Sequence, residues 1–150
     1  MDELTRAKHR ALYLLEHCDR TEQELRTKLS RNYEPETVEE AIRYVKQYDY
    51  IDDKRYAINY LKSRCQVKSR RQVEQELLYK KGISRDILEE VGQEFEEPDE
   101  RLLIRRWMEK KHYFPEKATR EEQRRFYQFL MRRGFEREDI LRELRGEERE

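Results

Sequence analysis

Apolar residues recur along the chain every three or four positions, which is the spacing of helices, and no useful stretch alternates apolar and polar residues as a strand would. Three of these patterns open with a Ser or Thr that is followed three residues later by Glu or Gln. In such a capping box the hydroxyl accepts a hydrogen bond from a first-turn amide, and the Glu or Gln bonds back to the cap amide. The boxes are Thr21 with Glu24, Ser69 with Gln72, and Thr119 with Glu122. Because they start 48 and 50 residues apart, they predict an internal repeat.

The three capped helices are predicted to end alike. Asn32, Gly82 and Gly134 stand where a left-handed residue closes a helix, since Gly and Asn tolerate positive φ best. A large apolar residue follows each of them and can fold back onto the helix that has just ended. A third helix follows in each case, and Pro35 and Ser84 are typical opening residues for it. An apolar position recurs six residues after the closing residue, at Val38, Leu88 and Ile140.

A first helix precedes each capping box. In the second repeat it follows Asp52 and Asp53, and in the third it follows Asp99, because carboxylates cap a helix start and complement its positive end. We therefore predict an all-α protein of three tandem three-helix repeats that form an elongated array. The predicted repeats are residues 1–49, 50–96 and 97–150, the last of which ends in a short frayed tail.

The composition supports thin helical units over one large core, since 35% of the residues are hydrophobic and 45% are charged. No window approaches the run of about 18 apolar residues that spans a bilayer, and the first residues carry no secretion signal. The two cysteines, Cys18 and Cys65, lack metal-ligand spacing and are expected to be free thiols. We therefore expect a cytoplasmic monomer that makes no contact with a membrane.

Four short runs of residues carry a resemblance to a known family. They are RTEQEL at 20–25, YIDDKRYA at 50–57, ELLYKKGI at 76–83 and RRGF at 132–135. These runs resemble the repeats of the bacterial RecX regulatory proteins, and the resemblance spans essentially the whole chain. The third repeat is the loosest match, because a Pro-containing loop at 112–118 precedes its second helix. In the first repeat, Asn32 stands where the family usually has Gly.

The resemblance implies a modulator of the RecA recombinase. RecX proteins bind RecA and its filaments on single-stranded DNA, and they mostly inhibit filament growth, strand exchange and co-protease activity. Their repeats form a curved body that is thought to lie in the groove of the filament. The implied partners are therefore the RecA filament and single-stranded DNA, with no cofactor.

The charges of the chain point independently to a binding surface, although 34 basic and 34 acidic residues give no net charge. Residues 54–81 and 101–133 each carry +7, and the segments around them are acidic. Such blocks can bind phosphates or an acidic protein surface, although a solvated helix face is the simpler reading for any single residue. The candidate binding residues are Lys62, Arg64, Lys68, Arg70, Arg71, Lys80, Lys81, Arg105, Arg106, Lys110, Lys111, Arg124, Arg125, Arg132 and Arg133. A charge reversal at Lys62, Arg70 and Arg71 is expected to weaken binding with little change in melting temperature.

Two other functions stay open on the residues alone. Tandem three-helix units also occur in stand-alone DNA-binding modules of the Myb kind, but those carry a tryptophan pattern in every repeat, and this chain has only Trp107. The third helices, which would read DNA, are acidic here and should repel phosphate. A purely scaffolding repeat is the other alternative. We expect no enzyme, because the chain has no phosphate loop, no metal-ligand set and no nucleophile–base pair. Trp107, Tyr56 and Phe126 are expected in the core.

Overall fold

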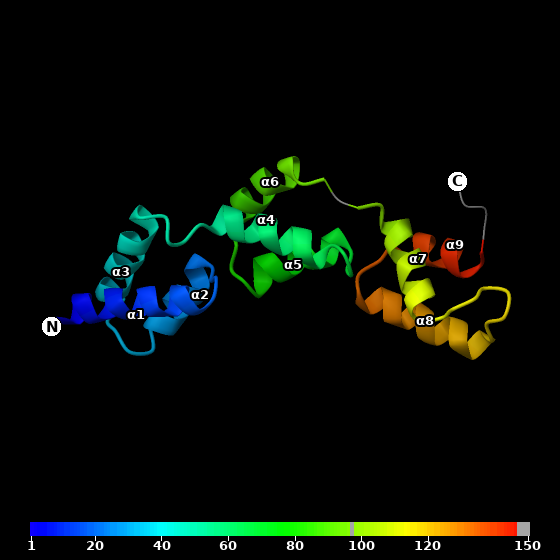
Figure 1. The fold of residues 1–150 in the computed structure, drawn as a ribbon, viewed down its shortest axis with the longest axis horizontal. Coiled ribbons are helices and arrows are strands. Elements are labelled where there is room, and N and C mark those ends of the chain that lie inside the picture. Colours follow the sequence, from blue (N-terminus) through cyan, green and yellow to red (C-terminus); the bar gives the residue numbers. More distant parts are fainter. Residues whose placement is uncertain (97, 147–150) are drawn as a thin grey trace. The chain divides into compact units, whose positions relative to one another are not determined.

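The computed structural model describes residues 1–96 and 98–146 (Figure 1). Within these residues the chain forms α-helices and no strand, which confirms the all-α class and the three tandem three-helix repeats. The helices are α1 (Glu3–His17), α2 (Glu22–Leu29), α3 (Pro35–Gln47), α4 (Asp53–Arg64), α5 (Arg70–Tyr79), α6 (Arg85–Glu94), α7 (Glu100–Lys110), α8 (Arg120–Arg132) and α9 (Arg137–Leu144). Residues 147–150, which make up most of the tail predicted to fray, lie outside the described residues.

The chain folds into two compact units, each described here by itself. The first unit comprises Met1–Tyr60 and Gln75–Phe95, and the second comprises Leu61–Glu74 and the described residues from Glu96 onward. Helices α4 and α5 each run from one unit into the other. The second repeat therefore contributes to both units, whereas the first and third repeats each belong to one.

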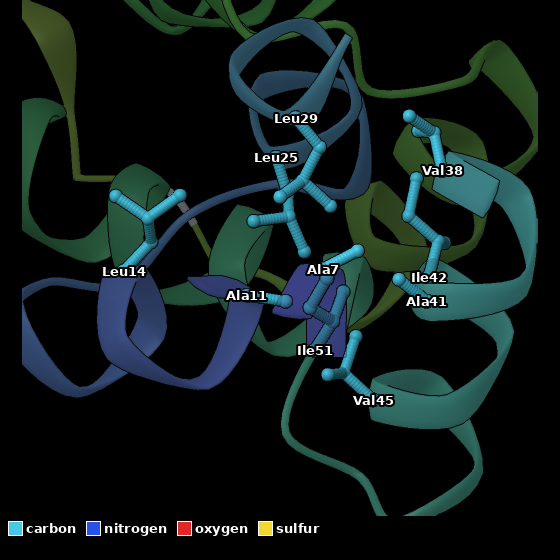
Figure 2. Packing of buried hydrophobic residues seen from close by; sticks show 10 residues of the cluster. All are labelled: Ala7, Ala11, Leu14, Leu25, Leu29, Val38, Ala41, Ile42, Val45 and Ile51. Carbon is cyan, nitrogen blue, oxygen red and sulfur yellow. The ribbon is translucent and has the colours of Figure 1, made fainter. Parts of the chain in front are cut away.

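The first repeat has a small, closely packed core. Side chains of α2 and α3 converge on Ala7 and Ala11 of α1 (Figure 2), which lie four residues apart and so share one face of that helix. Both alanines are fully buried, and their small size lets α3 approach α1 through Ala41. The buried cluster consists of Ala7, Ala11, Leu14, Leu25, Leu29, Val38, Ala41, Ile42, Val45 and Ile51.

The third repeat buries larger side chains. Of the three aromatic residues expected in the core, Trp107 and Phe126 are each only 8% exposed, whereas Tyr56 of the second repeat is half-buried. The ring of Tyr113 stacks on Phe126 with centroids 4.9 Å apart, and Phe135 folds back into the cluster after α8 has ended. The cluster consists of Leu103, Ile104, Trp107, Met108, Tyr113, Phe126, Leu130, Phe135, Ile140 and Leu144.

The predicted helix starts are present, but the amides of the cap residues Thr21 and Ser69 have different hydrogen-bond partners. Thr21 forms the complete capping box, with hydrogen bonds in both directions to Glu24 at 3.1 Å. The hydroxyls of Ser69 and Thr119 accept from the amides three residues on, both at 3.1 Å, as the boxes require. The amide of Ser69, however, donates to the carbonyl oxygen of Arg133 at 3.1 Å, a residue of the next repeat.

Two of the three predicted left-handed closing residues are confirmed. Gly82 has φ +71° and Gly134 has φ +87°, and the apolar residue after each is almost fully buried. The prediction for Asn32 is wrong, since its φ is not positive. The amides of Asn32 and Tyr33 both donate to the carbonyl oxygen of Leu29 at 3.1 Å, so the chain leaves α2 by continuing a right-handed turn.

The cap of one repeat is covered by the closing turn of the next repeat, and this arrangement occurs twice. In the first joint, which lies in the first unit, the hydroxyl of Thr21 donates to the carbonyl oxygen of Lys81 at 2.6 Å. The amide of Glu22 donates to Asp53 at 2.8 Å, and Gly82 lies so close that a Cβ there would be 2.5 Å from the Cβ of Gln23. Only a glycine closes the second helix at this distance.

The second joint repeats this arrangement within the second unit. Besides the bond from Ser69 to Arg133, the amide of Arg70 donates to Glu100 at 2.9 Å. A Cβ on Gly134 would meet the hydroxyl of Ser69. Thr21 and Ser69 are therefore 0% and 1% exposed, whereas the third cap, Thr119, is exposed.

Candidate partner-binding surface

Several candidate residues of the basic segment 54–81 form contacts in one of the two joints. Arg70 pairs with Glu74 at 2.8 Å, besides the bond of its own amide to Glu100. The guanidinium of Arg71 donates to the carbonyl oxygen of Gly134 at 3.4 Å. Lys81 pairs with Glu24 at 3.3 Å in the first joint, where that carboxylate raises the pKa of the ammonium against the effect of desolvation. Reversal of Arg70 and Arg71 is therefore expected to lower the melting temperature as well as any partner affinity.

Arg105, which belongs to the basic segment 101–133, pairs with a buried carboxylate in the third repeat. With Arg101 it holds the carboxylate of Glu143, at 2.9 Å and 3.2 Å, and the Glu143 side chain is only 1% exposed. Glu143 stands nine residues after Gly134, at the position where the first two repeats have a buried Ala41 and Val91. The ion pairs make a buried carboxylate tolerable at an apolar position.

Arg133 and two lysines surround an aromatic pair in the third repeat. Trp107 and Phe129 meet edge to face with centroids 5.0 Å apart, and the guanidinium carbon of Arg133 lies 4.4 Å from each ring. Lys110 lies 5.2 Å from the Trp107 ring, and Lys111 lies 5.4 Å from the Phe129 ring. Cations over aromatic faces are attracted to the π electrons, so these side chains are held near one place on the surface.

Beside this pair, the surface has a hollow of about 530 Å³, which we call the basic–aromatic hollow. Its cations come from the end of α7 and from α8, and its aromatic wall comes from α8 and the loop before it. The residues that define it are Lys111, Arg125, Arg132, Tyr113, Phe126 and Phe129. Burial raises the pKa of the Tyr113 phenol, which keeps this wall neutral. Positive charge beside aromatic rings suits a partner that presents anionic groups together with planar or apolar ones.

The structure thus brings together five of the candidate residues, namely Lys110, Lys111, Arg125, Arg132 and Arg133, and separates the others. Lys62 and Lys80 are exposed elsewhere, and Arg106 lies 3.4 Å from the amide oxygen of Gln66. Arg64 and Lys68 lie outside the hollow, and Arg124 lies on another side of α8.

Sequence reasoning did not assign the aromatic wall, or the neighbouring His112 and Gln128, to this site. A signal was present in α8, since Glu122, Arg125 and Phe129 line the hollow at helical spacing. His112 carries no such signal, because its left-handed φ of +56° and its place in the hollow depend on the loop.

Other classes of site find no support in the part of the chain that the structure describes. No group of three or more His, Cys, Asp or Glu side chains is placed to hold a metal ion there. No helix among the described residues is both long enough and apolar enough to cross a membrane.

The fold and this surface define a tandem three-helix-repeat protein whose third repeat carries a basic, aromatic surface. Sequence models of the three RecX three-helix domains match the chain in order, the first over residues 7–44, the second over 52–91 and the third over 99–144. Regulatory protein RecX of Caldanaerobacter subterraneus is 32% identical over 145 residues, which cover 95% of this chain and 71% of that protein. The chain belongs to the RecX family of regulatory proteins.

Other relatives agree with this assignment. Regulatory protein RecX of Haemophilus influenzae is 32% identical over 140 residues, which cover 89% of both chains. That of Clostridium perfringens is 30% identical over 138 residues, and the chain spans 65% of its length. The crystal structure of RecX from Lactobacillus salivarius has a TM-score of 0.69 at 24% identity and covers 94% of this chain and 96% of its own. A second RecX crystal structure has a TM-score of 0.78 at 23% identity and covers 97% and 74%. At these identities the structures show a shared fold.

Proposed function

We propose that this protein binds the RecA recombinase and its filaments on single-stranded DNA, and that it inhibits recombinase and co-protease activity. The observation that carries the proposal is the match of all three RecX domains in order along the chain. The basic–aromatic hollow supports it, because a filament on DNA presents both acidic protein surface and phosphates. The proposal places the protein in the cytoplasm, acting as a monomer.

Within this proposal, Lys111, Arg125 and Arg132 are the first residues to test. All three are exposed, and no carboxylate pairs with them among the described residues, so their reversal should leave the fold intact. The joint residues Arg70, Arg71 and Lys81 are less suitable, because their contacts hold the repeats together. Loss of binding after changes there would not separate a partner contact from a loss of structure.

The test measures binding of the chain to RecA with and without single-stranded DNA and nucleotide, together with DNA-dependent ATP hydrolysis. The variant Lys111→Glu, Arg125→Glu, Arg132→Glu is expected to bind filaments at least about tenfold more weakly and with a smaller dependence on salt. The matched control reverses three exposed arginines of the first repeat, Arg10, Arg31 and Arg43, and so changes the net charge equally. No binding by the unchanged chain, together with unchanged ATP hydrolysis, would sink the proposal.

The alternative is a stand-alone DNA-binding module. Exposed cations beside aromatic rings in the third repeat are also typical of surfaces that bind single-stranded nucleic acid. Against it, the acidic residues of the third helices, which a Myb-like module would place on DNA, are partly used within the protein. Glu39 pairs with Arg26 and Glu90 pairs with Lys54, both at 2.9 Å. Tight duplex binding without RecA would favour the alternative.

A further inference from the structure

A second depression in the third repeat lies between α8 and α9, and it differs from the basic–aromatic hollow in chemistry. This α8–α9 groove has a volume of about 510 Å³. Its rim carries three exposed arginines of α8 and α9 and the exposed Arg145 that follows α9, and its floor carries a tyrosine and two leucines. The residues on which the argument rests are Arg120, Arg124, Arg137, Tyr127, Leu141 and Leu144. No acidic residue among those the structure describes lines it.

Three arginines of the rim have no ion-pair partner in the part of the chain that the structure describes. Among the described residues, no carboxylate oxygen lies within 4.0 Å of the guanidinium groups of Arg120, Arg124 or Arg137. The charge of these three arginines is therefore concentrated on two neighbouring helices, and no ion pair within residues 1–96 and 98–146 accounts for it. A cluster of this kind has a high positive potential and attracts anionic groups.

In the first repeat, the residues at the corresponding positions form ion pairs that join two helices. There Arg26 pairs with Glu22 at 3.0 Å and with Glu39 at 2.9 Å, which joins α2 to α3. Counted from the cap residue, Arg26 and Glu22 correspond to Arg124 and Arg120 in the third repeat. Counted from the closing residue, Glu39 corresponds to Leu141. The third repeat has thus kept the arginine and lost both carboxylates.

The two joints indicate which anion fits this end of the second helix. In each joint the amide that follows the cap donates to a carboxylate of the next repeat, from Glu22 to Asp53 and from Arg70 to Glu100. In the described part of the third repeat, the corresponding amide of Arg120 has no acceptor. In both joints, therefore, the amide that follows the cap binds a carboxylate that the next repeat supplies.

The floor adds an apolar requirement. Leu144 is 4% exposed, and Leu141 and Tyr127 are half-buried, so a ligand in the groove covers aliphatic surface as well as meeting arginines. A phosphate backbone offers anions but no aliphatic group for such a floor. A peptide with carboxylates on both sides of an apolar side chain offers both.

We propose that the α8–α9 groove is a docking site for an acidic peptide segment of a partner protein, with an apolar side chain on the floor and flanking carboxylates on the arginines. The site is separate from the basic–aromatic hollow, and it does not require that the partner be RecA. Its arginines should govern orientation and association rate, and its floor should govern residence time.

The test uses the full chain and a fluorescein-labelled peptide of glutamates around a central leucine, with fluorescence anisotropy as the readout. Saturable binding is expected, together with none for the same peptide with glutamines in place of the glutamates. The variant Arg120→Ala with Arg124→Ala should weaken binding about tenfold, as expected for two exposed ion pairs. Leu141→Ser should weaken it as well. Arg142→Ala, on an exposed site of α9 outside the groove, is the matched control and should have no effect.

Two further measurements keep the outcomes distinct. Circular dichroism melting of each variant separates loss of the site from loss of the fold, and oligo-deoxythymidine tested on the same variants separates peptide from nucleic acid. Absence of peptide binding to the unchanged chain, or equal binding by the groove variants, overturns the proposal. Groove variants that lose only oligonucleotide binding also overturn it, because they assign the groove to phosphates. If the chain binds the peptide but not RecA, the groove proposal stands and only the proposed function is overturned.

Discussion

The carboxylate of Asp53 accepts a hydrogen bond from the amide of Glu22 at 2.8 Å, so an acid at the start of one repeat caps a helix of the repeat before it. Its neighbour Asp52 caps its own helix, with its carboxylate 3.1 Å from the amide of Arg55. Glu100 and Arg70 repeat the first relationship at 2.9 Å. Adjacent residues that look equivalent in the sequence thus have different roles, one within a repeat and one between repeats.

The first prediction concerns the dependence of stability on pH at Asp53. Burial raises the pKa of its carboxyl, and the amide of Glu22 offsets only part of this effect, with Glu22 and Lys46 as charged neighbours. The folded protein therefore holds the proton more tightly than the unfolded chain, and this residue's contribution to stability falls as the pH rises through the raised pKa. Asp53→Asn keeps the acceptor for the Glu22 amide and should remove this fall.

The measurement compares melting of Asp53→Asn and the unchanged protein at about pH 3 and about pH 7. The variant should gain relative to the unchanged protein as the pH rises. Asp52→Asn controls for loss of a charge at the same helix start. A difference that is equal at both pH values would contradict the assignment.

The second prediction concerns the closing turn of the second joint. Gly134→Ala places a Cβ against the hydroxyl of Ser69 and 2.7 Å from the Cβ of Gln72, in a left-handed residue. The free energy of unfolding should fall by about 1–3 kcal/mol in urea titrations. Gly146→Ala is the matched control, since Gly146 is also left-handed at φ +67° but a Cβ there would lie 3.3 Å from Pro115. Equal effects at the two glycines would mean that only the backbone conformation, and not the joint, matters.

A third prediction tests the buried carboxylate of the third repeat. Arg101→Ala with Arg105→Ala removes two cations that pair with the buried Glu143 carboxylate, which should lower the free energy of unfolding by about 3 kcal/mol. Adding Glu143→Val, which restores the residue type of the second repeat at Val91, should recover most of the loss, because no buried charge remains. Urea unfolding of the three proteins checks this. If the added substitution lowers stability further, the carboxylate has contacts that the ion pairs do not explain.

The fourth prediction uses the single tryptophan as a reporter of the basic–aromatic hollow. Trp107 is held by a hydrogen bond from its indole to the carbonyl oxygen of Val67 at 3.0 Å, and its ring touches Phe129, a wall of the hollow. With 5-fluorotryptophan in the chain, the one ¹⁹F resonance should shift when filaments bind. The shift should be lost in the variant with Lys111, Arg125 and Arg132 reversed. An unchanged resonance on tight binding would place the partner elsewhere.

The capping boxes and glycine turns could be predicted because they are local. A hydroxyl at Thr21 and a carboxylate at Glu24 lie within one turn, so their reciprocal bond depends on little beyond the backbone between them. Gly82 and Gly134 signal positive φ by residue type alone. Asn32 shows the limit of this signal, since Asn tolerates a left-handed conformation without requiring it.

The basic surface could be predicted only in part, because charge runs do not show which cations are already engaged. Arg71 and Arg133 are adjacent to other candidates in sequence, yet one donates to Gly134 and the other lies over Trp107. The partners of Arg105 and Lys81 stand 38 and 57 residues away. Contacts at such separations depend on how helices pack, which the period of apolar residues does not specify.

By itself the sequence determined the class of this protein, namely three tandem three-helix repeats with the starts of their helices, because helix signals act within a few residues of one another. Only the tertiary structure decided that Thr21 and Ser69 are covered by the turn of the following repeat while Thr119 is not. It also decided which arginines hold Glu143 and which are left to line the α8–α9 groove. The physical reason is that desolvation and ion pairing depend on which surfaces meet, and those surfaces meet only once the helices have packed.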